Sequence, residues 1–205
     1  HLIMAGLLLG IGSIAMSYVL PKLPFVRQHI DTRLHAASAQ VAFRFNSFIA
    51  LALAERIAGP QALLLIAVLI GVCVPLFNVA AVWPMARHAQ RSFARELARN
   101  PLILATASGL LANIVGLHIP SWTEPTLQRI GAASLALGLM AAGAGMQFGH
   151  LMAAKTLAVA LLTIRHLLTP LLAYGLALGF ALDSTQTSVL LAFSALPTAS
   201  SCYVL

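Results

Sequence analysis

Residues 61–86 read QALLLIAVLIGVCVPLFNVAAVWPMA, a run of 26 residues without one charged side chain. A helix needs about 20 mostly apolar residues to cross the hydrocarbon core of a bilayer, so this run is long enough. The whole chain has the same character, because 60% of its 205 residues are hydrophobic and only 8% are charged. Soluble domains carry about 25% charged residues. The sequence therefore predicts an all-α polytopic membrane protein, and it argues against a soluble enzyme or a nucleic-acid-binding protein.

Six further apolar segments flank this run and complete a set of seven candidate spans. They are Leu2–Leu20, Val41–Ala58, Pro101–Leu117, Leu127–Met146, Thr156–Ala181 and 188–205. The segment Val41–Ala58 is unusual, because its uncharged core, Phe45–Ala54, has only 10 residues. So short a segment cannot cross alone, and we expect it to be broken, tilted or lined by polar neighbours.

The basic residues are distributed unevenly between the loops that alternate across the membrane. With the loop after Leu20 on the cytoplasmic side, the inside connections hold nine of the 12 lysines and arginines. These nine are Lys22, Arg27, Arg33, Arg44, Arg87, Arg91, Arg95, Arg99 and Lys155. By the positive-inside rule, this bias predicts seven spans with residue 1 outside and residue 205 inside. The net charge of +7 is then an orientation signal.

Motifs of soluble enzymes are missing from the sequence. It contains no HExxH, GxSxG or P-loop pattern, and no pair of carboxylates at a catalytic spacing. We therefore predict that the chain is not an enzyme and holds neither a cofactor nor a metal. His29 and His35 share the first inside loop, where we expect them to be solvated rather than metal-bound. Cys73 and Cys202 lie far apart in apolar runs, which predicts two buried free thiols.

Two spans combine polar side chains with features that interrupt a helix. The second span contains Asn46 and Ser47, and the seventh contains Pro197 with Thr198 and Ser200. Proline removes a backbone donor, and in lipid the freed carbonyl must find a partner or line a water-filled cavity. Two interrupted, polar segments in corresponding halves indicate the midplane binding site of a transporter. The alternative for Pro197 alone is a plain helix kink.

Arg165 and His166 lie within the predicted span Thr156–Ala181. A charge inside a span is costly and by default marks a functional position. The alternative is that the Arg165 side chain extends to the cytoplasmic interface.

Small residues also recur every four positions, as in Ala105, Gly109 and Asn113, which predicts close helix packing.

Four runs of the sequence resemble, in chain order, helices of the auxin efflux carrier family. FRFNSFIALALAERIAG resembles the family's fourth helix, which usually reads RNTGFLGLPL, and RNPLILATASGLLANIVGLHIP resembles the sixth. IGAASLALGLMAAGAGM resembles the seventh helix, and LLAFSALPTASSCYVL resembles the ninth, whose ALP motif carries the crossover proline. The resemblance covers essentially the whole chain and is greatest to bacterial members that are like malonate transporters.

The resemblance implies a ten-helix fold of two inverted repeats, five helices each, with crossed broken helices as in bile acid/sodium symporter-like carriers. This chain would be a fragment that holds helices three to nine. Residues 1–86 would be three helices of the first repeat, 87–100 the basic cytoplasmic linker, and 101–205 the first four helices of the second repeat. The family's proline in helix four corresponds to Ala52 here, a departure that puts a symmetric pair of proline breaks in doubt.

The resemblance further implies secondary transport of a small organic anion, such as malonate or another carboxylate, by alternating access. The predicted substrate-binding residues are Asn46, Ser47, Pro197, Thr198, Ser200 and Arg165. The expected partners are the carboxylate and the lipid bilayer of a bacterial inner membrane; coupling to H⁺ or Na⁺ and a homodimer stay open. Two alternatives remain, a sodium-coupled carrier similar to bile acid symporters and a seven-helix receptor or sensor.

Overall fold

Helices make up nearly all of the structure, and the only strand-like pairing in the described part of the chain is one antiparallel bridge between Phe45 and Thr198. The computed structural model describes residues 1–24, 28, 30–88, 93–99, 101–144, 155–199 and 202. In chain order the helices are α1 (Leu2–Val19), η1 (Leu20–Lys22), α3 (Thr32–Ser38), η2 (Ala39–Ala42), α4 (Ser47–His88), α5 (Phe93–Arg99), α6 (Pro101–Ile114), α7 (Glu124–Ala144), α9 (Lys155–Thr163), the π-helical η3 (Ile164–Leu168), α10 (Thr169–Gly179) and α11 (Ser184–Ala195). The predicted all-α class is confirmed.

Three helical stretches within the described residues are long and apolar enough to cross a bilayer. They are Leu2–Lys22, Arg56–Pro84 and Lys155–Gly179, which correspond to the first, third and sixth predicted spans. A shorter apolar helix, Ile103–Ile114, lies within the fourth predicted span. The chain is therefore embedded in a membrane, in agreement with its composition.

The second predicted span, Val41–Ala58, differs most from the structure. Its helical part begins earlier, at Thr32, because the Asp31 carboxylate accepts a 2.7 Å hydrogen bond from the Arg33 amide and so caps α3. The helix continues as η2 to Ala42, the backbone then leaves helical geometry, and α4 starts at Ser47. The expectation of a broken helix is confirmed, although its bounds in the sequence analysis were wrong.

A second interruption separates the second predicted span from the third. Ala58 and Gly59 have non-helical backbone angles within α4, and Gly59 lies at φ 62°, ψ −147°, a region that only glycine reaches easily. Pro60 follows directly and begins the long apolar arm, since proline fits the first turn of a helix. The chain therefore turns between its second and third spans at the predicted place.

We expect the Gly59→Ala variant to be less stable than the native protein, because a Cβ atom strains this backbone by about 1–3 kcal/mol. The matched control is Gly71→Ala in the same helix, where an added Cβ meets no atom within 4 Å. Alanine is the better helix former, so the control should melt at the native temperature or slightly above it. Thermal unfolding of the full-length protein in detergent measures both variants. Equal melting temperatures would contradict the strained geometry.

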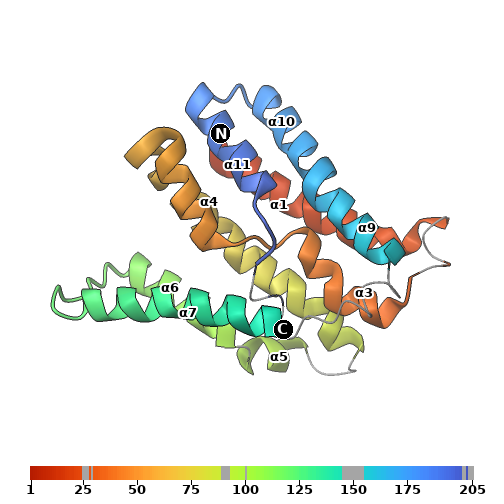
Figure 1. The fold of residues 1–205 in the computed structure, drawn as a ribbon, viewed down its shortest axis with the longest axis horizontal. Helices are drawn as coiled ribbons and strands as arrows, with labels where there is room; N and C mark the ends of the chain where they lie inside the picture. Colours follow the sequence, from red (N-terminus) through yellow and green to blue (C-terminus); the bar gives the residue numbers. More distant parts are fainter. Residues whose placement is uncertain are drawn as a thin grey trace.

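The main bundle packs the first and the last described helices around α4. Helix α11 packs against α4 and α10, while α1 packs across the same two helices (Figure 1). Aromatic rings fill the centre, where Phe45 lies 4.4 Å from Phe193 and 5.9 Å from Phe77, measured between ring centroids. The break between η2 and α4, which contains Phe45, thus lies inside a packed core rather than at its surface.

The α6–α7 hairpin extends away from this bundle, and α6 contacts the end of α4 and α5 (Figure 1). The predicted small-residue face of α6 is not packed against another helix of the described chain. Ala105, Gly109 and Asn113 are all exposed. Spacing of small residues shows where close packing is allowed, but it does not name the partner helix, so this expectation was wrong for the described residues.

Candidate functional site: the crossing of two helix breaks

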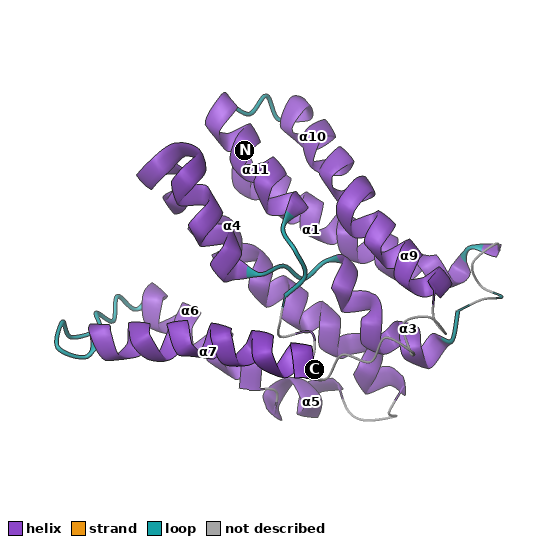
Figure 2. Cartoon of the chain, viewed as in Figure 1, coloured by secondary structure: helices purple, strands orange, loops and turns teal. Residues whose placement is uncertain are grey.

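The breaks that follow η2 and α11 meet in the middle of the bundle. Figure 2 shows the two loop segments, residues 43–46 and 196–199, running across each other between helices. The Asn46 amide donates a 3.0 Å hydrogen bond to the Pro197 carbonyl, and Phe45 pairs with Thr198 in the antiparallel bridge. Segments about 150 residues apart in sequence therefore satisfy each other's main-chain groups where lipid offers no water.

Asn46 holds the start of the second half of the broken helix. Its Oδ1 atom accepts a 3.2 Å hydrogen bond from the Ile49 amide, and its carbonyl accepts a 3.0 Å bond from Ala50. Asparagine is among the preferred N-cap residues, since its side chain replaces a missing helix acceptor. The residue is only 4% exposed. The second predicted span therefore opens at Asn46 without a proline, and Ala52 lies within regular helix.

Thr198 connects the break after α11 to η2, the helical segment before the break at Asn46. Its hydroxyl donates a 3.1 Å hydrogen bond to the carbonyl of Val41, in η2. Pro197 is exposed and Thr198 is partly exposed, so both remain accessible at the crossing. Ser47 is half-buried at the first position of α4, and Ser200 lies outside the described residues.

Arg165 reaches the crossing from the π-helical segment η3. It is 2% exposed, and its Nε atom donates a 2.9 Å hydrogen bond to the Leu196 carbonyl, to which Nη2 also donates. The alternative that this side chain extends to the cytoplasmic interface is therefore wrong. His166, its neighbour in the chain, is exposed.

Arg44 is a second buried cation at the crossing that the sequence analysis placed in a cytoplasmic connection. It is 6% exposed, and it donates hydrogen bonds to Gln40 at 2.8 Å and to Asn78 at 3.3 Å. Arg44 therefore does not belong in the count of loop charges. Its position directly before the short uncharged core, Phe45–Ala54, was the available signal. The Cys202 side chain lies within electrostatic range of both Arg44 and Arg165.

Two further predictions about single residues are changed by the structure. His35 is buried, and its Nε2 atom donates a 2.9 Å hydrogen bond to the Ser17 carbonyl, so it is not a solvated loop histidine. His29 lies outside the described residues. Cys73 is buried as predicted, whereas Cys202 is partly exposed, and both are free thiols.

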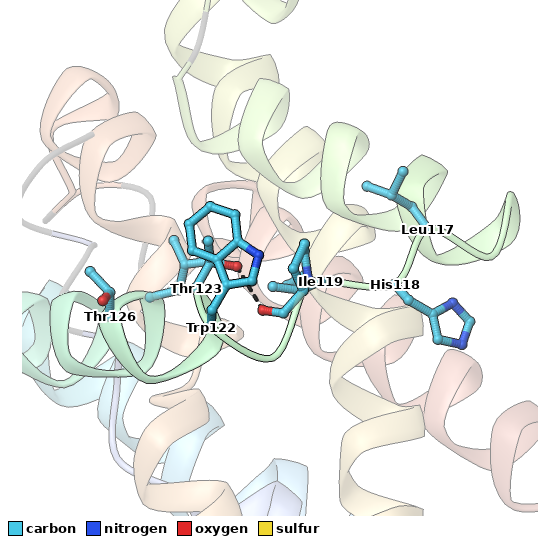
Figure 3. Close-up of a pocket in the computed structure, with 8 residues that line it drawn as sticks. Leu117, His118, Ile119, Trp122, Thr123 and Thr126 are labelled. Carbon is cyan, nitrogen blue, oxygen red and sulfur yellow. Dashed lines mark hydrogen bonds between the residues drawn. The ribbon is translucent and has the colours of Figure 1, made fainter.

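A hollow of about 590 Å³ lies away from the crossing, at the turn between α6 and α7 (Figure 3). Its walls are mostly apolar, and the Thr123 hydroxyl is used internally, in a 2.8 Å hydrogen bond to the Pro120 carbonyl. No lysine or arginine lines it, so it does not offer an anion the guanidinium charge present at the crossing. The lining residues are Leu117, His118, Ile119, Pro120, Trp122, Thr123, Thr126 and Leu127.

Comparison with known proteins assigns the chain to a family. A family model described as "Membrane transport protein" matches residues 26–205. No curated protein and no solved structure matches the chain. This family consists of transporters, in agreement with the prediction that the chain is not an enzyme, and it favours a carrier over a seven-helix receptor. Since the match covers most of the sequence, including both helix breaks, the chain belongs to the membrane transport proteins of the auxin efflux carrier family.

Proposed function

We propose that the chain is part of a secondary transporter that moves a small organic anion, such as malonate or another carboxylate, across a bacterial inner membrane. The observation that carries the proposal is the crossing itself. Two interrupted helices exchange a main-chain hydrogen bond, Asn46 to Pro197, in a buried region that also holds two guanidinium groups. Buried cations in a membrane protein are costly, and an anionic substrate would offset that cost.

The substrate site that we propose lies at the crossing. The positive end of the α4 helix dipole begins at Ser47, and Asn46, Thr198 and Ser200 supply polar groups for a carboxylate. Pro197 keeps the second break open, and Arg165 adds positive potential. The helix end that adjoins Pro197 in the chain is the C-terminal, negative end of α11, so within the described residues the positive dipole end at the site belongs to α4.

The proposed transport cycle is alternating access in a ten-helix protein with two inverted repeats of five. Residues 1–86 and 101–205 would contribute to the two repeats, joined by the linker 87–100, and a homodimer would fit this architecture. One bundle would rock against the other about the crossing, whose bonds join segments far apart in sequence. In the described linker, Arg95 and Arg99 are exposed, as expected for a cytoplasmic or headgroup-facing helix.

Uptake by the full-length protein in proteoliposomes tests this function. Labelled malonate, malate and an indole carboxylic acid are each supplied without a gradient, with a pH gradient and with a Na⁺ gradient. We expect saturable uptake of at least one carboxylate that unlabelled carboxylates compete away. Strict dependence on Na⁺ would instead support the carrier similar to bile acid symporters. Uptake no faster than in protein-free liposomes, in every arm, would contradict the proposal.

A further inference from the structure

The end of α11 presents a carbonyl that its own helix cannot satisfy. Leu196 is buried and has ψ 147°, so the helix stops there and the Leu196 carbonyl is directed out of the i to i+4 hydrogen-bond ladder of the helix. In a bilayer such a carbonyl needs a protein partner, because water is absent. The partner is Arg165, which directs both Nε and Nη2 to this one oxygen. The positive charge also faces the negative end of the α11 dipole, which is the favourable orientation.

The sequence around Arg165 explains why this side chain points at α11. Pro170 lacks an amide hydrogen and its ring crowds the preceding turn, and the turn before it is widened into the π-helical segment η3. Thr169 closes that wide turn, since both its amide and its hydroxyl bond to the Ile164 carbonyl, the hydroxyl at 2.8 Å. Arg165 is buried beside α11 while His166, one residue on, is exposed.

Arg165 has no carboxylate partner among the residues that the structure describes, and the ionisable side chain near it is that of Cys202. Its hydrogen bonds there go to Leu196 alone. The neighbouring carbonyl, that of Pro197, accepts the Asn46 amide. The two hydrogen bonds from Arg165 thus hold the Leu196 carbonyl. The next carbonyl in the chain, that of Pro197, makes the main-chain contact between the two breaks.

We propose that Arg165 is a positioning residue, which acts through the Leu196 carbonyl to fix the break after α11 and so the register in which Pro197 meets Asn46. Its guanidinium does this without contact to the substrate. Of the two measurements below, only the transport measurement rests on the proposed function. The geometry of the break can be followed separately, because Cys202 lies just beyond it and its amide bonds to the Ala199 carbonyl at 3.0 Å.

The test uses full-length protein with Cys202 as the only cysteine. The variants are Arg165→Gln, Arg165→Lys and Pro170→Ala, with His166→Gln as the matched control in the same π-helical turn. Two properties are measured: the rate constant for alkylation of the Cys202 thiolate by N-ethylmaleimide, taken from the pH dependence of the reaction so that a change in nearby charge does not enter it, and the KM and maximal rate of carboxylate uptake. Size-exclusion profiles in detergent establish that each variant is folded.

We expect Arg165→Gln to raise the alkylation rate about tenfold, the ratio expected when a hydrogen bond from a charged donor is lost. Its maximal uptake rate should fall by a similar factor with KM nearly unchanged. Arg165→Lys keeps the charge and one donor, so it should recover at least about a third of the rate. Pro170→Ala keeps the arginine but relaxes the turn that aims it, and it should raise alkylation without any change of charge.

The opposite pattern overturns the inference. If Arg165→Gln raises KM at an unchanged maximal rate and leaves Cys202 as slow to react as in the control, the guanidinium binds substrate directly. If Arg165→Gln does not fold, Pro170→Ala and Arg165→Lys decide, and control-like alkylation in both excludes a positioning role. The absence of carboxylate uptake by native protein would contradict the proposed function. The alkylation rates would still test the positioning role of Arg165, because they do not depend on transport.

Discussion

Replacing Asn46 by alanine is expected to reduce carboxylate uptake by about a hundredfold while the protein still inserts into the membrane. Alanine removes the Oδ1 acceptor of the Ile49 amide, a partly buried hydrogen bond at the start of α4, and it removes the side-chain amide that we propose for the substrate. Each lost interaction of this kind costs about 1–3 kcal/mol, and every 1.4 kcal/mol is a factor of about ten. Initial rates of uptake in proteoliposomes measure the loss.

Two matched variants separate capping from substrate binding at this position. Asn46→Ser keeps an N-cap oxygen but lacks the amide donors, so it should restore thermal stability more than transport. Asn113→Ala makes the same change at an exposed position near the end of α6 and should leave both unchanged. If Asn46→Ala transports at the rate of Asn113→Ala, the crossing is not the substrate site.

Much of the fold could be predicted because the bilayer restricts it to helices and fixes their length. The break at Asn46 was predictable for a local reason, since asparagine before Ser47 is an N-cap pattern that works without a proline. The turn at Gly59 and Pro60 was predictable from the same kind of signal. The cap at Asp31 was equally local, but the basic residues around it favoured a loop, and the start of α3 was missed.

Partners across the bundle could not be predicted, because no periodicity connects them. Arg165 and Leu196 are 31 residues apart, and the partner is a main-chain oxygen, which every residue possesses. Arg44 was counted as a loop charge, since a chain position beside an apolar run does not reveal which helix covers it. Its bond to Asn78 spans 34 residues. The sequence thus shows where polar groups enter the membrane, while only tertiary packing decides what they contact.

Replacing Pro197 by alanine is expected to reduce uptake more than tenfold and yet to leave thermal stability unchanged or higher. Alanine restores a backbone amide and is the best helix former, so α11 can continue past Ala195 and satisfy its own carbonyls. That continuation would turn the residue 197 carbonyl away from the Asn46 amide and break the pairing of Phe45 with Thr198. A stability gain with loss of activity is the pattern expected at a site kept irregular for function.

In Pro197→Ala, uptake is expected to fall while thermal stability is kept or rises. Simple misfolding would instead lower both uptake and thermal stability. Pro197→Gly gives an intermediate test, because glycine restores the amide but does not favour helix, so the break should persist and part of the transport with it. Pro120→Ala is the matched control, since this proline lies in the exposed α6–α7 turn, away from the crossing. Native rates of uptake in Pro197→Ala would show that the break after α11 is a structural kink, and the substrate site would have to be sought elsewhere on the protein.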